Sequence, residues 1–149
     1  MEMKRIEEAR RWFHQAFYDL KAARWNVEGG FFSTVCFLAQ QSGEKALKAL
    51  LYAKGGRRQA LFTHSLVEMV NAAQKLKVGG MDKLTTPARA LDLHYIPSRY
   101  PNGLPGGYPH AFYDRQEAQM AIEAAEQILG VIEAVLLEAG LSRILPGNE

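Results

Sequence analysis

The spacing of apolar residues constrains this chain most, because they recur every three to four positions through most of its length. That period places apolar side chains along one stripe of an α-helix, whereas a half-buried strand needs strict alternation. No stretch alternates with period two for long enough to form a strand. The sequence therefore predicts an all-α fold.

Five helices are expected, packed as an up-and-down bundle. The first runs to about Glu28 and the second from about residue 31 to 54, each followed by a pair of glycines. The second helix is apolar over most of its surface, which is typical of the central helix of a bundle. Gly43 in its middle costs about 1 kcal/mol relative to alanine, so we expect another helix to pack closely there.

Capping patterns mark the other three helices. Ser65 and Glu68 have the spacing of a capping box and open the third helix, which ends before Gly79-Gly80. Thr86-Pro87 is expected to be the N-cap and first residue of the fourth. Asp114 opens the fifth, which closes at residue 140.

A long connection separates the fourth helix from the fifth. Residues 97–112 contain four of the six prolines and three glycines. We expect an irregular loop, and a loop of this length in a compact domain is usually functional or disordered. The sequence thus predicts a single helical domain over residues 1–140 and a loose tail over 141–149.

The 149 residues, 48% hydrophobic and 23% charged, suit one soluble globular domain. Cys36, the single cysteine, cannot form an internal disulfide or a multi-cysteine zinc site, and in the most apolar helix it is expected to be a core residue. There is no apolar run of membrane-spanning length, and the first residues are too charged for a signal peptide. We expect a cytoplasmic protein with no metal, no cofactor and no membrane contact.

Charge is unevenly distributed although the total is only +2. Residues 29–62 carry +4, with Glu44 as the only acid, and residues 114–149 carry −5. Such segments can be solvated faces that complement each other, or the basic one can bind anions.

Lys45 and Lys48, on the polar side of the second helix, are the first candidate ligand-binding residues. Glu44 and Lys48 have the spacing of a helical ion pair, so one interpretation is a solvated strip. In the other interpretation this face lines a cleft, and the lysines hold an anionic group.

His64, Arg99, Tyr100 and His110 are the remaining candidates. His64 lies at a helix start, where the helix dipole favours a neutral imidazole. Arg99 follows the fourth helix, and it either caps that helix or is held toward a site by Tyr100-Pro101. A histidine and an arginine that converge on a phosphate suit metal-independent RNA cleavage, since one moves protons and the other stabilises phosphorane charge.

Several segments together resemble the HEPN domain family, the nucleotide-binding helical domain of higher eukaryotes and prokaryotes. They are ARRWFHQAFYDLKAA (9–23), FLAQQSGEKALKALL (37–51), THSLVEMV (63–70) and LDLHYIPSRYP (91–101). The resemblance covers residues 6 to 137 and implies a five-helix bundle that usually forms a homodimer.

The resemblance also implies a choice of functions. Many members are encoded beside a minimal nucleotidyltransferase, and such pairs act as toxin–antitoxin modules. Others are metal-independent endoribonucleases with an Arg-x4–6-His motif, and others are non-catalytic binding modules. Arg58 and His64 enclose five residues and Arg57 and His64 enclose six, whereas Arg99 and His110 enclose ten.

Three hypotheses follow. The first is a non-catalytic homodimer that binds a nucleotide or RNA phosphate beside a nucleotidyltransferase, through five residues: Lys45, Lys48, His64, Arg99 and Tyr100. The second is a ribonuclease toxin whose working pair combines Arg58 or Arg99 with His64 or His110. The third is a purely structural module that joins a second protein.

Overall fold

The computed structural model describes residues 2–147 and is all-α. Within that range it contains seven α-helices and three 3₁₀ turns. The helices are α1 (Glu2–Glu28), α2 (Phe32–Ala53), α3 (Arg58–Phe62), α4 (Leu66–Lys75), α5 (Thr85–Asp92), α6 (Pro109–Phe112) and α7 (Arg115–Glu138), and the turns are η1 (Met81–Leu84), η2 (Pro101–Gly103) and η3 (Ser142–Ile144). The five predicted helices correspond to α1, α2, α4, α5 and α7. The predicted count was too low, because α3 and α6 are short helices in segments expected to be loops.

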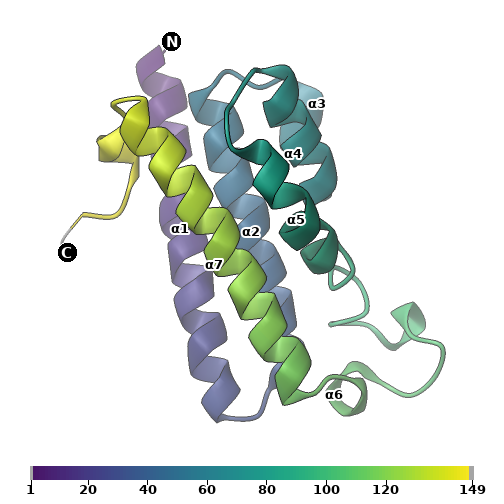
Figure 1. The fold of residues 1–149 in the computed structure, drawn as a ribbon. Helices are drawn as coiled ribbons and strands as arrows, with labels where there is room; N and C mark the ends of the chain where they lie inside the picture. The colour runs from purple at the N-terminus through teal and green to yellow at the C-terminus, as the bar shows by residue number, and fades with distance from the viewer. Residues whose placement is uncertain (1, 148–149) are drawn as a thin grey trace.

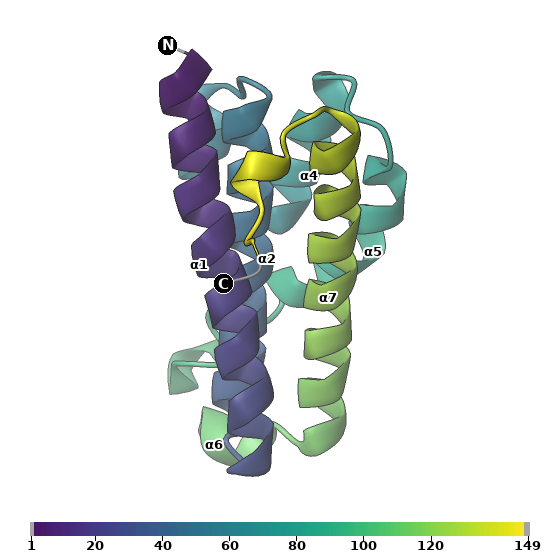
Figure 2. The same ribbon diagram turned by 90° about the vertical axis from the view of Figure 1, so that its left-hand side faces the viewer.

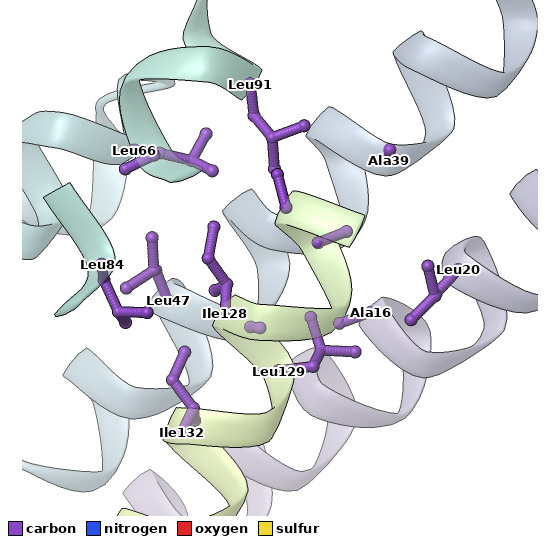
Figure 3. Close-up of a cluster of buried hydrophobic side chains, with 14 of the residues drawn as sticks. Ala16, Leu20, Ala39, Leu47, Leu66, Leu84, Leu91, Ile128, Leu129 and Ile132 are labelled. Atoms are coloured by element: carbon purple, nitrogen blue, oxygen red, sulfur yellow. The ribbon is translucent and has the colours of Figure 1, made fainter. Parts of the chain in front are cut away.

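Helix α2 lies at the centre of the bundle. The long helices α1, α2 and α7 run side by side, and α4 and α5 form a shorter layer on the other side of α2 (Figures 1 and 2). Thirteen of the 22 residues of α2 are buried, in agreement with its expected central position. The core draws leucine, isoleucine and alanine side chains from α1, α2, α4, α5 and α7 (Figure 3).

At Gly43, side chains from three other helices pack tightly against α2. A Cβ atom on it would lie 2.8 Å from Leu66 Cδ2, 2.9 Å from Leu91 Cδ1 and 3.4 Å from Ile128 Cδ1. These side chains come from α4, α5 and α7. The expectation that this glycine permits close packing is therefore confirmed.

Two of the predicted helix starts are confirmed in atomic detail. The Ser65 side chain accepts a hydrogen bond from the Glu68 backbone N–H, and Asp114 accepts one from that of Glu117. The fourth start is displaced: α5 begins at Thr85, so Thr86 and Pro87 both lie in its first turn.

The long connection is more regular than predicted. Residues 93–99 form consecutive turns, and η2 and α6 each begin at a proline, Pro101 and Pro109. Proline has no backbone N–H to leave unpaired at such a start, and its fixed φ suits a helical turn. Prolines were the reason for expecting an irregular loop, but Pro101 and Pro109 are the first residues of these two helical turns.

The segment after Gly140 differs from the loose tail that was expected. It forms η3, where Ile144 is buried against the core while Leu141 and Leu145 are partly buried. This turn packs on α1 and α7. Residues 148 and 149 of the expected tail lie outside the described range. None of the helices described is long and apolar enough to span a bilayer.

Candidate functional site

A buried carboxylate, Glu44, organises the polar face of α2. Its Oε2 accepts hydrogen bonds from Lys48 Nζ at 3.0 Å and His64 Nδ1 at 3.3 Å, and its Oε1 accepts one from Gln40 Nε2 at 3.1 Å. The Gln40, Glu44 and Lys48 residues are each at most 5% exposed. A buried charge needs such partners, because removing it from water is costly.

Both candidate lysines are paired with carboxylates inside the protein. Besides its bond to Glu44, the Lys48 ammonium lies 5.1 Å from the centroid of the Trp12 ring. Lys45 forms an ion pair with Asp19 of α1. The solvated strip that one interpretation expected is therefore largely buried, and the structure commits the charges of these lysines to neighbouring side chains.

His64 is the exposed end of the Glu44 network. It precedes α4, and its imidazole stacks on the Tyr95 ring with centroids 4.9 Å apart and planes inclined by 19°. A carboxylate can only accept hydrogen bonds, so Nδ1 carries the proton shared with Glu44. In neutral His64, Nε2 is then the atom with a lone pair.

Arg99 is surrounded by aromatic rings. Its guanidinium carbon lies 4.5 Å from the centroid of Phe37, 4.8 Å from that of Tyr95 and 5.0 Å from that of Tyr100. Its Nε donates to the Tyr95 carbonyl at 3.1 Å, so the residue also caps the turn it ends. Within residues 2–147, Arg99 forms no ion pair with a carboxylate.

Arg99 and His110 line the same pocket, although ten residues separate them in the sequence. The pocket has a volume of about 370 Å³, and its wall includes Ser33, Thr34 and Phe37 at the start of α2. Tyr108 also lines this pocket and stacks with His110, centroids 6.4 Å apart and planes inclined by 6°.

The Tyr95 ring links His64 to Arg99. Because 4.9 Å and 4.8 Å add to 9.7 Å, the imidazole centroid and the guanidinium carbon are at most 9.7 Å apart. Tyr100, half exposed, adds an aromatic surface beside Arg99. Four of the predicted residues, His64, Arg99, Tyr100 and His110, therefore belong to one region of the surface.

Arg58 lies apart from this cluster. It begins α3, where its guanidinium carbon is 5.3 Å from the centroid of the Phe62 ring. Its neighbour Arg57 lines a different pocket, between α3 and α4. The five- and six-residue spacings to His64 thus do not bring either arginine into contact with that histidine in the structure.

Sequence reasoning overlooked Tyr95 and Asp92. Tyr95 was not among the candidate site residues, yet its ring contacts both His64 and Arg99. The sequence did contain a signal for Tyr95, because Arg99 has one tyrosine four positions before it and another, Tyr100, directly after it. Asp92 bonds to α4 across 25 to 27 positions, and no local pattern indicates such a contact.

A pair formed by half-buried His94 and buried Tyr113 closes the base of the long connection. His94 Nδ1 and the Tyr113 hydroxyl are 3.0 Å apart, and the two residues flank the segment that carries Arg99 and His110. Burial lowers the pKa of His94. Burial, with smaller contributions from Cys36 and Glu117, raises the pKa of Tyr113 to about 12. The pair is thus neutral near pH 7, and one proton is shared between Nδ1 and the hydroxyl oxygen.

Cys36 is buried in α2, as expected, and burial is the main cause that raises its pKa to about 12. A thiol with so high a pKa is a poor nucleophile. In the part of the chain that the structure describes, no group of three or more His, Cys, Asp or Glu residues is placed to hold a metal ion.

Comparison with known proteins identified one matching family model, described as the HEPN domain, over residues 9–135. A crystal structure of a Thermus thermophilus protein is 35% identical, with a TM-score of 0.76, and the match covers 87% of this chain and 98% of that one. An archaeal HEPN homologue is 33% identical with a TM-score of 0.68, over 85% of this chain and 96% of that one. A Thermotoga maritima HEPN domain protein is 28% identical with a TM-score of 0.67, over 85% and 98%. No curated protein matches the chain.

Proposed function

This chain belongs to the HEPN domain family, and on that basis we propose that it is a non-catalytic module that binds a nucleotide or an RNA phosphate. In this proposal it acts as a homodimer alongside a minimal nucleotidyltransferase, in a toxin–antitoxin-like pair. We infer the nucleotidyltransferase partner from membership of the family. We infer a phosphate-bearing ligand from the geometry around Arg99.

One observation carries the proposal: Arg99 is held by three aromatic rings and is paired with no carboxylate in residues 2–147. The rings and the Nε bond fix the guanidinium plane, which reduces the entropy lost when an anion binds. A phosphate accepts two parallel hydrogen bonds from such a group. This arrangement differs from that of Lys45 and Lys48, whose charges are already matched.

The neighbouring residues fit the parts of a nucleotide. Tyr100 is 49% exposed and Tyr108 is 56% exposed, so both have ring surface on which a base can stack. His64 and His110 are hydrogen-bonding groups at the edges of the same region. Lys45 and Lys48 contribute indirectly, since they and their carboxylates fix the face of α2 from which Glu44 contacts His64.

Exposed apolar side chains around the long connection support the homodimer. They are Leu93, Ile96 and Phe112, and each is at least 40% exposed, whereas the rings of Tyr100 and Tyr108 stay open to the ligand. Apolar residues gathered on one surface commonly mark an interaction site. A second copy that covered them would place two Arg99 sites near one interface. Sedimentation equilibrium of the purified protein tests whether the protein dimerises.

Calorimetric titration with ATP, GTP and a short single-stranded RNA at low salt tests the ligand. We expect binding by the wild type and a loss of roughly 10- to 100-fold in affinity for Arg99→Gln, equivalent to the ~1–3 kcal/mol of a charge-assisted contact. Arg143→Gln is the matched control, because it removes the same charge from η3, at the opposite end of the bundle from α6 (Figure 1).

Absence of binding at millimolar ligand would eliminate the proposal, and so would an equal loss of affinity in both arginine variants. In the second case the attraction would depend on net charge and not on the aromatic site.

Metal-independent endoribonuclease activity is the second candidate, and the shared pocket of Arg99 and His110 favours it. Incubation of the protein with structured and single-stranded RNA in EDTA tests for cleavage. If cleavage occurs, His64→Ala, His110→Ala, Arg99→Ala and Arg58→Ala identify the working pair. Cleavage that persists in both histidine variants would exclude both histidines.

Co-expression with a minimal nucleotidyltransferase encoded beside the gene tests the partner. We expect the two proteins to copurify and the complex to keep the ligand response. Copurification without any response to nucleotide or RNA would instead favour the third hypothesis, a structural module that joins a second protein.

A further inference from the structure

The surface region around Arg99 is built from two parts of the chain, His64 on one side and the Tyr95–Arg99 segment on the other. The Asp92 carboxylate joins the backbone that carries these two parts. His64 lies in the turn before α4, whereas Tyr95 and Arg99 lie in the turns after α5. Asp92, the last residue of α5, accepts hydrogen bonds from Ser65 Oγ at 3.0 Å, the Leu66 backbone N–H at 2.7 Å and the Val67 backbone N–H at 3.1 Å.

These bonds do more than satisfy the first turn of α4. Ser65 already accepts a hydrogen bond from the backbone N–H of Glu68, so the helix has a local N-cap of its own. Asp92 adds a negative charge at the positive end of the helix dipole and pairs two further N–H groups. Ser65, which follows His64, is thereby bonded to Asp92, which lies three positions before Tyr95.

Few other contacts set the position of the His64 ring. Its partners are Glu44, at 3.3 Å from Nδ1, and the face of Tyr95. The His64 side chain is 56% exposed, so packing alone does not restrict its rotamers. The segment bearing Tyr95 is stiffened on its own side, where Ser98 Oγ donates to the His94 carbonyl and Arg99 Nε donates to that of Tyr95.

We propose that Asp92 is the positioning residue of this site: it holds the His64 turn in register with the Tyr95–Arg99 segment. It does not line the Arg99 pocket, and it acts through Ser65 and the backbone of α4. The inference rests on the proposed function for its biological consequence, since the register matters because His64 and Arg99 serve one ligand. Loss of Asp92 releases the His64 ring from Tyr95 and weakens ligand binding without any change to Arg99.

NMR of histidine-labelled protein without ligand is the primary test. The stacked Tyr95 ring shifts the His64 ring protons upfield, and Tyr95→Leu gives the reference value for an unstacked ring. We expect Asp92→Ala to lose at least half of the difference between the wild type and Tyr95→Leu. A destabilised core variant, Ile132→Val, is the control, and its His64 shifts should equal those of the wild type.

Unchanged His64 shifts in folded Asp92→Ala would overturn the proposal, as would an equal change in Ile132→Val. If Asp92→Ala does not fold, Asp92→Asn decides the question, because it keeps one oxygen acceptor but loses the charge. We expect it to lose a smaller part of the shift, and a wild-type value for His64 would again overturn the proposal.

A second readout separates this inference from the proposed function. Titration of Asp92→Asn with the short RNA should show a 3- to 10-fold loss of affinity, smaller than that of Arg99→Gln, as expected for an indirect effect of ~1 kcal/mol. If the wild type binds no nucleotide or RNA, the proposed function fails while the NMR result still decides the role of Asp92. If the wild type binds and Asp92→Asn binds equally well, the positioning role fails and the proposed function stands.

Discussion

At the scale of single residues, the face of α2 is defined by buried charge. Glu44 and Lys48 were expected as an i,i+4 pair on a solvated strip, and the pair exists, but both side chains are at most 6% exposed. Spacing along a helix reveals which side chains meet, whereas burial depends on what covers them. Here the covering residues come from α1 and the turn before α4, which the local sequence does not specify.

Lys48→Ala tests the cost of leaving this carboxylate unpaired. We expect the free energy of unfolding to fall by about 3 kcal/mol, because a buried ion pair that loses one partner leaves an uncompensated charge. Urea denaturation at neutral pH measures it. The exposed pair of Arg11 and Glu8, joined at 2.7 Å, provides the control, and Arg11→Ala should cost less than about 1 kcal/mol. Equal effects of the two substitutions would contradict the account.

His94 gives the protein a defined sensitivity to acid. Burial lowers its pKa from the ordinary value of 6.5, so the unfolded chain takes up a proton at a pH where the folded chain does not. The free energy of unfolding therefore declines as pH falls below about 6.5, until the pKa of the folded state is reached. Urea denaturation of the wild type and His94→Gln between about pH 8 and pH 5 measures the difference. A wild-type decline no steeper than that of the variant would contradict this origin.

At the scale of elements, glycine and capping residues predicted more than composition did. The Ser65 and Asp114 caps and the close packing at Gly43 are all confirmed, because each depends on local geometry that the sequence expresses directly. The short helices α3 and α6 were missed, since a single turn has no apolar periodicity to detect. The cap that Asp92 adds to α4 was missed because its partners are 25 to 27 positions away.

Gly43→Ala tests the helix packing at the centre of the bundle. Alanine favours the helix by about 1 kcal/mol, but its Cβ would lie within 3 Å of two leucine methyl groups that are completely buried. Overpacking of this kind typically costs about 1–3 kcal/mol, so we expect a net loss of stability. Thermal unfolding followed by circular dichroism measures it, and an increase in Tm would show that the leucines move aside freely.

At the scale of the whole molecule, all-α architecture and family could be predicted from the sequence, whereas the arrangement of the site could not. The period of the apolar residues was enough to predict the all-α architecture. The QQxxEKALKALL, THSL and YIPSRYP segments were enough to predict the family. The site required knowing that Tyr95 contacts both His64 and Arg99 and that the connection folds back so that His110 shares a pocket with Arg99. Those contacts depend on tertiary packing and not on residue spacing.

The chain end beyond α7 contributes to the core of the whole molecule. Ile144 has no exposed surface, and its 3₁₀ turn lies against α1 and α7 (Figure 2). Ile144→Ala should therefore cost about 2–4 kcal/mol in the free energy of unfolding by urea, as for other buried isoleucines. Leu137→Ala, at a half-exposed position of α7, should cost under about 1 kcal/mol. A negligible effect at Ile144 would mean that the turn detaches in solution.

In the proposed function, the guanidinium of Arg99, bound among aromatic rings, receives a phosphate group. The most direct measurement follows the Nε–Hε resonance of Arg99 by NMR while a short RNA or ATP is titrated into the protein at low salt, with Arg99→Gln used to assign the signal. The account predicts that this resonance moves in proportion to the bound fraction and reaches its limit at saturation. Saturable binding that leaves the Arg99 resonance in place would contradict it.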